Sequence, residues 1–159
     1  MIDISLYKDD NERLKSFLID ELNKDGWADK FCIKWTDEEY LFFKDEEFVK
    51  QRAIFNPAGG FYNKDIIEDL VKNALLNNID NIIRWISHPA SRYCFSYEND
   101  VNIGYFYKKY NSDKIDTNKM IVYLRKSRLK GGNEEIFISL AMPVHPDFEL
   151  INGEVEEQF

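Results

Sequence analysis

Two stretches in the N-terminal third of the chain place hydrophobic residues at helical spacing. From Asp9 to Asn23 one side is apolar and the other is charged, which predicts an amphipathic surface helix. Residues 37–51 repeat the pattern, and Thr36-Asp37-Glu38-Glu39 fits a capping box with acidic residues in the first turn. These helices form an acidic segment that we predict to span residues 1–55.

The pattern changes at Asn56-Pro57-Ala58-Gly59-Gly60, the strongest turn signal in the chain. It predicts a boundary between the N-terminal segment and a core domain of residues 56–146. A long helix is predicted over residues 64–87, with a broad apolar face and a candidate break at Asn77-Asn78. His88-Pro89 ends this helix, because the residue before a proline is pushed out of the helical region.

Shorter hydrophobic runs between turn residues predict strands in the rest of the core. Tyr93–Tyr97 and Asn102–Tyr107 flank a polar turn, which predicts a hairpin. Met120–Leu124 and Ile136–Leu140 predict a third and a fourth strand, joined by a basic loop over residues 125–133. The sequence therefore predicts an α+β fold, in which the N-terminal helices and the long helix pack on a four-stranded antiparallel sheet.

The chain is acidic, and its charges are unevenly distributed. Its formal net charge is −8 over 159 residues. Residues 51–145 carry a net charge of +3, whereas residues 1–50 carry −6 and residues 146–159 carry −5. We therefore expect an acidic tail, residues 147–159, after the core. An acidic balance disfavours general binding to nucleic acid and favours a cationic partner.

Several classes of protein do not fit this sequence. No apolar run is long enough for a membrane helix, and the N-terminus has no secretory signal, so we expect a cytoplasmic protein without membrane contact. Cys32 and Cys94 lack metal-ligand spacing and are expected to be reduced thiols. Gly59-Gly60 is not followed by the residues of a phosphate loop. We expect no metal and no cofactor.

The order of elements in residues 55–143 resembles that of a known family. Phe55-Asn56-Pro57 and Gly59-Gly60-Phe61 precede a helical stretch that ends in Asn81–Ile86, and the last strand, Phe137–Pro143, leads into a proline. This order is similar to the RNase A-like toxin domain of bacterial contact-dependent growth inhibition systems. The resemblance implies an RNase A-like α+β core.

The resemblance also implies where catalytic residues should stand. Toxins of this family use a histidine and an arginine near the start of the domain, and a threonine and a tyrosine two positions apart on the last strand. Aligned on Pro143, the last two positions hold Leu140 and Met142, which can neither donate a hydrogen bond nor move a proton. Residues 1–55 contain no histidine, and Arg52 alone is only a cation. We therefore predict a degenerate member that is not an enzyme.

The two histidines are a separate test of ribonuclease chemistry. His88 and His145 both precede a proline, and we expect them at exposed turns. The alternative brings both histidines to one phosphate beside a cation, for which the candidates are Arg84, Lys119 and Arg125. A shift of the last strand by one position restores a hydroxyl at Ser139, but Ala141 then stands where the tyrosine is needed.

These features predict an immunity protein that binds and neutralises a basic nuclease toxin through complementary charge. The predicted toxin-facing surface combines the acidic side of the helix at 37–51 with the acidic tail. Its candidate partner-binding residues are Asp37, Glu38, Asp45, Glu46, Glu47, Glu156 and Glu157. We expect no direct contact with nucleic acid.

Two other functions remain open. One is an active RNase A-like ribonuclease of the toxin type with a rearranged active site, built on His88 or His145. The other is a non-catalytic module that binds RNA or protein outside toxin defence. Expressing the chain alone tests for the ribonuclease, because a nuclease stops growth. A steep salt dependence of binding to RNA would favour an RNA-binding module, and the same dependence of binding to a basic protein would favour the immunity protein.

Overall fold

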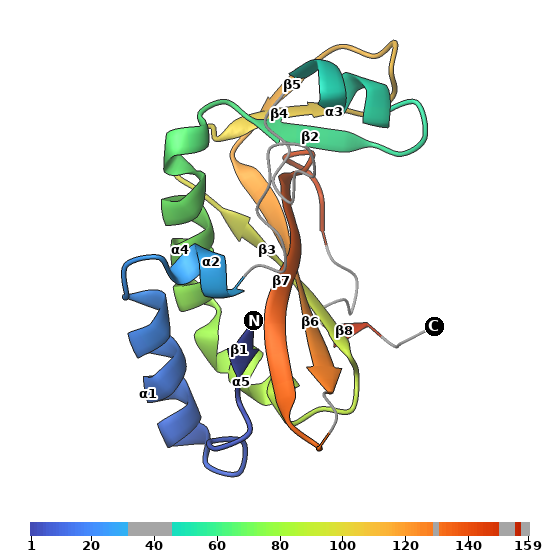
Figure 1. Ribbon diagram of the computed structural model, residues 1–159. Helices are drawn as coiled ribbons and strands as arrows, with labels where there is room; N and C mark the ends of the chain where they lie inside the picture. Colours follow the sequence, from blue (N-terminus) through green and yellow to red (C-terminus); the bar gives the residue numbers. More distant parts are fainter. Residues whose placement is uncertain (32–45, 129–130, 150–154, 157–159) are drawn as a thin grey trace.

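The computed structural model describes residues 1–31, 46–128, 131–149 and 155–156. In this part of the chain, a five-stranded antiparallel sheet carries helices on one face, and a smaller three-stranded sheet lies at one end (Figure 1). In chain order the elements are β1 (Ile2–Asp3), α1 (Asn11–Leu22), α2 (Trp27–Phe31), α3 (Glu46–Arg52), β2 (Ala58–Phe61), a 3₁₀ turn (Lys64–Ile66), α4 (Ile67–Asn77), α5 (Ile79–Ile86), β3 (Arg92–Glu98), β4 (Gly104–Tyr107), β5 (Ile115–Thr117), β6 (Lys119–Arg128), β7 (Glu134–Pro143) and β8 (Val155–Glu156).

The large sheet has the strand order β1-β7-β6-β3-β8, with β1 and β8 as two-residue strands at its edges. β6 pairs with β3 from Arg125 opposite Arg92 to Lys119 opposite Glu98. Its other edge pairs with β7, with a register shift at Tyr123. The predicted α+β class, with helices on an antiparallel sheet, is confirmed.

A single hydrophobic core joins the helices to the large sheet. The apolar side of α1 is buried there with α4 and α5 and with the inward residues of β7. Asp10 caps α1, because its carboxylate accepts a hydrogen bond from the backbone N–H of Arg13. Among the described residues, no helix is both long enough and apolar enough to cross a membrane.

The predicted break in the long helix is confirmed. α4 ends at Asn77 and α5 begins at Ile79, with Asn78 between them. The Asn78 amide donates to the hydroxyl oxygen of Tyr93 at 2.6 Å and accepts a hydrogen bond from the amide of Asn81 at 3.0 Å. This polar side chain therefore fixes the junction of the two helices against β3.

The predicted hairpin of Tyr93–Tyr97 with Asn102–Tyr107 is wrong. β3 pairs with β6 and β8, whereas β4 pairs with β2 and β5 in the small sheet. The connecting segment carries the chain from one sheet to the other, held by hydrogen bonds from the backbone N–H of Asn99 to Asn118 and of Ile103 to Thr117. All four residues of β4 are buried, so this strand needs neighbours on both edges and both faces.

Gly59-Gly60 also differs from the prediction, because both glycines lie inside β2 rather than in a turn. A Cβ atom on Gly59 would overlap the carbonyl oxygen of Pro143 and lie 2.9 Å from that of Tyr105. Glycine is therefore required here for the close approach of β2 to the end of β7.

The basic loop predicted over residues 125–133 is shorter in the structure. β6 continues to Arg128 and β7 begins at Glu134, with Arg128 directly opposite Glu134. Opposite charges facing each other across an antiparallel pair favour this extension of the hairpin. For the helix predicted over 37–51, the described part is α3, and the capping box at Thr36 lies outside the described residues.

Candidate functional site

Among the acidic residues predicted to bind a partner, those that the structure describes lie in two separate places. Glu46 and Glu47 form the first turn of α3, beside the small sheet, and both are exposed. Glu156 lies in β8 at the edge of the large sheet, at the register position opposite Arg92 (Figure 1). The others lie outside the described residues: Asp37, Glu38, Asp45 and Glu157.

The two acidic residues of α3 differ in their surroundings. The Glu46 carboxylate accepts a hydrogen bond from the ammonium of Lys114 at 2.9 Å, and this bond raises the pKa of Lys114. Glu47 is exposed on the same turn. The helix is held by Val49, which is fully buried against the small sheet, and by Lys50, whose ammonium lies 5.3 Å from the ring centre of Tyr110. These contacts hold α3, and therefore its acidic first turn, in place on the small sheet.

The two histidines lie at opposite ends of β6. Lys126 Nζ donates to the carbonyl oxygen of His88, whereas the residue before His145, Val144, donates to the carbonyl oxygen of Lys119. These two lysines are seven positions apart along β6, a distance of about 23 Å. Each histidine accepts a local hydrogen bond at 3.0 Å from a backbone N–H two positions on. The structure therefore does not bring the two histidines to one phosphate.

The positions aligned with the family's last two catalytic residues take part in packing. Leu140 and Met142 are half-buried against the cluster of Val49, Tyr105 and Tyr107. Ser139 donates to the carbonyl oxygen of Tyr123 at 3.3 Å, where β6 and β7 shift register. None of these contacts resembles a nucleophile beside a base.

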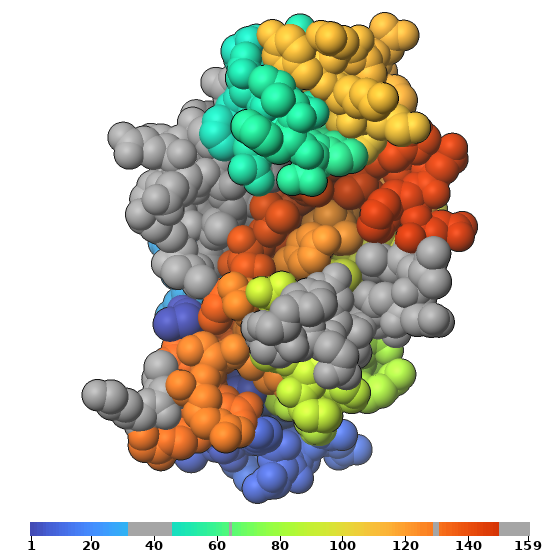
Figure 2. Space-filling model, turned by 90° about the vertical axis from the view of Figure 1, so that its right-hand side faces the viewer, coloured from blue at the N-terminus to red at the C-terminus, as the bar shows by residue number. Residues whose placement is uncertain are grey.

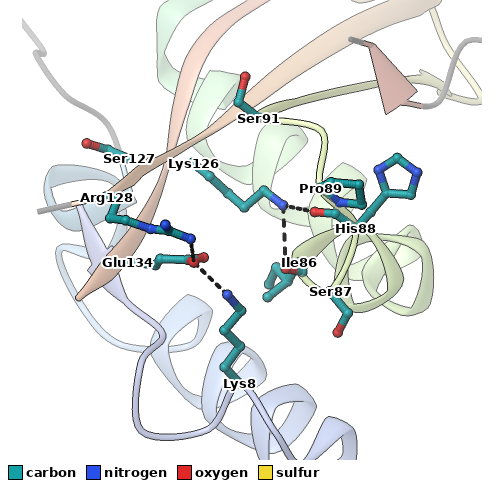
Figure 3. Close-up of a pocket in the computed structure, with 10 residues that line it drawn as sticks. All are labelled: Lys8, Ile86, Ser87, His88, Pro89, Ser91, Lys126, Ser127, Arg128 and Glu134. Carbon is teal, nitrogen blue, oxygen red and sulfur yellow. Dashed lines mark hydrogen bonds and ion pairs between the residues drawn. The ribbon is translucent and has the colours of Figure 1, made fainter. Parts of the chain in front are cut away.

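A pocket of about 450 Å³ opens where the α5–β3 turn, the end of the β6–β7 hairpin and the segment after β1 meet (Figure 3). Three cationic side chains and one carboxylate line it. Serine hydroxyls and the α5–β3 turn complete the lining, which consists of Lys8, Ile86, Ser87, His88, Pro89, Ser91, Lys126, Ser127, Arg128 and Glu134. The pocket thus gathers ionic groups that are far apart in the sequence.

Lys126 closes the end of α5. Its ammonium donates to the carbonyl oxygens of Trp85 at 3.1 Å, Ile86 at 3.5 Å and His88. Carbonyl groups at a helix C-terminus carry partial negative charge and lack helical partners, so a lysine satisfies them. Burial lowers the pKa of Lys126. The ammonium also lies 5.0 Å from the ring centre of Trp85.

Glu134 joins three segments of the chain. One oxygen of its carboxylate accepts hydrogen bonds from Lys8 Nζ at 2.5 Å and from Arg128 Nη2 at 3.1 Å. Its backbone N–H donates to Ser5 Oγ at 2.9 Å, and its carbonyl oxygen accepts from Ile4. Burial raises the pKa of Glu134, but the bonds from Lys8 and Arg128 outweigh burial and leave this pKa below its ordinary value.

We expect Glu134 to make stability depend on acid pH. Because its pKa is lowered in the folded state, the stabilisation is present above about pH 4.5, the ordinary value, and is lost as the pH falls through the lowered value. Glu134→Gln should cost about 2 kcal/mol at neutral pH and much less near pH 3, measured by urea unfolding. Glu12→Gln, at an exposed glutamate in the first turn of α1, is the control and should cost less than about 1 kcal/mol, the usual contribution of a carboxylate at a helix N-terminus. An equal loss for Glu134→Gln at both pH values would contradict this role.

A second, smaller pocket of about 210 Å³ lies on the face of the large sheet opposite the helices, the face shown in Figure 2. Arg92 and Arg125 line it from directly opposed positions on β3 and β6, together with Tyr123 and Ser139. The structure thus places Arg125 opposite Arg92 in a pocket whose described lining includes neither histidine. Among the residues described, no group of His, Cys, Asp or Glu is arranged to hold a metal ion.

Sequence reasoning missed the ionic cluster of Lys8, Lys126 and Glu134. The contact between Lys8 and Glu134 spans 126 positions, and no local pattern indicates it. One signal was present in the run Arg125-Lys126-Ser127-Arg128, because alternation along a strand sends Lys126 and Arg128 to the same face. Because this run was predicted to be a loop, its alternation did not indicate that Lys126 and Arg128 share a face.

Comparison with known proteins gives a likeness of fold. No family model matches the chain, and no curated protein matches it. A chain in the crystal structure of the CdiA-CT/CdiI complex from Y. kristensenii 33638 is similar, with a TM-score of 0.54 and 16% sequence identity. The match covers 64% of this chain and 92% of that chain. At this identity the two chains share a fold.

Proposed function

We propose that the chain is an immunity protein of a bacterial contact-dependent growth inhibition system. It binds a basic nuclease toxin through complementary charge and neutralises it. The observation that carries the proposal is the fold shared with a chain of a CdiA-CT/CdiI complex, in a protein with a net charge of −8. A toxin that holds RNA or DNA needs a basic surface, and an acidic antidote is attracted to it.

The arrangement of ionisable groups supports a binding role over catalysis in the described part of the chain. His88 and His145 are separated along the whole of β6, and each is bonded within its own turn. Leu140 and Met142 pack against an apolar cluster. The alternative, an RNase A-like ribonuclease of the toxin type, would need its base and its acid within reach of one phosphate.

The proposed toxin-facing surface includes the acidic turn of α3. Glu47 is its strongest described candidate, because Glu46 already shares its charge with Lys114. The acidic residues near 37–45 and in the tail belong to the same proposal. Rim charges of this kind act mainly on the rate of association, and their effect falls as salt increases.

The proposal is tested by expressing the chain in bacteria alone and beside toxin domains of contact-dependent growth inhibition effectors. We expect normal growth and intact RNA with the chain alone, because it carries no nuclease activity. With one toxin domain, the chain should restore growth selectively. Growth arrest and degraded RNA from the chain alone would instead support the ribonuclease alternative.

A charge reversal tests the surface. We expect Glu47→Lys to slow association with the neutralised toxin about tenfold at low salt, and less at high salt, because an attractive charge becomes repulsive. Glu12→Lys is a matched control, since Glu12 is also an exposed glutamate in the first turn of a helix, α1. Surface plasmon resonance measures the association rate of each variant at low and at high salt. Equal effects of the two variants would exclude the α3 turn from the interface.

A further inference from the structure

The pocket beside α5 is a positively charged site on an acidic protein. Lys8, Lys126 and Arg128 line it against the single carboxylate of Glu134. The local balance is therefore positive, although the whole chain carries −8. A concave site in which positive charges outnumber negative ones attracts anionic ligands.

Glu134 holds two of these cations next to each other. Lys8 Nζ and Arg128 Nη2 touch the same carboxylate oxygen at 2.5 and 3.1 Å, so the two nitrogens are at most about 5.6 Å apart. Each uses one donor on Glu134, whereas an ammonium has three donors and a guanidinium has five. The pair can therefore donate to a second acceptor that carries several oxygens.

The burial of these groups is typical of a preorganised binding site. Glu134 is only 8% exposed, so its position is fixed, whereas the Arg128 side chain is 75% exposed and opens to the pocket mouth. In Figure 3 Lys8 reaches the Glu134 carboxylate from below and Arg128 reaches it from the left, whereas Lys126 lies above them and points toward the carbonyl oxygen of His88. Lys126 keeps its own donors on the end of α5 and contributes charge.

A purely structural role accounts for only part of this cluster. The N-terminal segment is already tied to the hairpin by backbone bonds of Ile4 and Ser5 with Glu134. Lys8 adds a further tie across the same junction. Arg128 uses one donor on Glu134 across the hairpin, and the rest of its exposed guanidinium is open to a ligand in the pocket.

We propose that this pocket binds the phosphate group of a phosphomonoester of nucleotide size, with Lys8 and Arg128 as the donors. A phosphate presents several oxygens that can bridge two cations at this spacing, and Arg–phosphate contacts are frequently bidentate. The volume of about 450 Å³ lies within the range of small-ligand sites and leaves room for a nucleoside. This inference does not depend on the proposed toxin partner.

The test is a titration of the full chain at low ionic strength with inorganic phosphate and with a 5′-mononucleotide, followed by calorimetry. We expect saturable binding at one site, with a dissociation constant of about 1 mM or tighter for the mononucleotide. Arg128→Gln should weaken it at least about tenfold, and Lys8→Gln similarly. Lys108→Gln, which removes the same charge from the exposed residue that follows β4, is the control and should leave binding unchanged.

Three results would overturn the proposal. The first is no saturable binding of either probe to a chain whose thermal unfolding shows that it is folded. The second is an equal loss with Lys108→Gln, which would indicate nonspecific attraction. The third is binding of a dicarboxylate as tight as that of the mononucleotide, which would assign the pocket to an acidic side chain of a protein. A short RNA that binds only with a terminal phosphate would place the same phosphate at an RNA end and support the proposal.

Discussion

Gly59→Ala is expected to lower the free energy of unfolding by about 3 kcal/mol or more. The added Cβ would overlap the carbonyl oxygen of Pro143 and lie 2.9 Å from that of Tyr105. Both obstacles are backbone atoms, so no side-chain rotation relieves the overlap. The small sheet must move away from the end of β7 to accept the methyl group. Urea unfolding, followed by tryptophan fluorescence, measures the loss.

Gly131→Ala is the matched control for this prediction. Gly131 has a φ of 93°, and among the described residues other than its chain neighbours no atom lies within 4 Å of the position that its Cβ would take. Alanine there costs about 1 kcal/mol of backbone strain and no packing. Similar losses for the two variants would show that β2 does not approach β7 as closely as described.

Trp85→Ala is the second substitution with a large expected effect, a loss of about 3–5 kcal/mol. Trp85 is 1% exposed, its ring stacks on Tyr93 with ring centres 5.7 Å apart, and its indole N–H donates to the carbonyl oxygen of Ala90 at 3.1 Å. Removing the ring leaves a cavity at the end of α5 and exposes the site where Lys126 caps the helix. Thermal unfolding and urea unfolding both report this loss.

Trp85→Phe separates the ring from its hydrogen bond. Phenylalanine fills most of the volume but leaves the carbonyl oxygen of Ala90 without the indole donor, which costs about 1–2 kcal/mol. We therefore expect an intermediate stability. If Trp85→Ala were no less stable than Trp85→Phe, the ring would not be the packing centre of this end of the core.

Local patterns predicted the helices better than the strand pairing. The apolar period of α1, and the Asn78 break between α4 and α5, depend on nearby residues and were confirmed. β3 pairs with β6, which begins more than twenty positions further along the chain. The polar turn at Glu98–Asp100 was therefore a misleading hairpin signal. Glycine is equally ambiguous, because a turn and a close backbone approach both require it, as at Gly59.

The candidate site was predictable only in its charges. The acidity of the first turn of α3 is visible in the sequence, but the ion pair of Glu46 with Lys114 is not, because it joins α3 to the segment before β5. Likewise, the separation of His88 and His145 follows from the direction of β6, which the sequence does not reveal. Contacts between distant segments decide which charged groups share a surface.

The most direct test of the proposed function is the integrity of RNA with purified proteins. The chain is incubated with RNA alone, and then with RNA and a basic nuclease domain from a contact-dependent growth inhibition effector that it neutralises in cells. We expect intact RNA with the chain alone, and protection of RNA from the toxin once the chain equals the toxin in amount. Degradation of RNA by the chain alone would contradict it and would assign the protein to the ribonucleases.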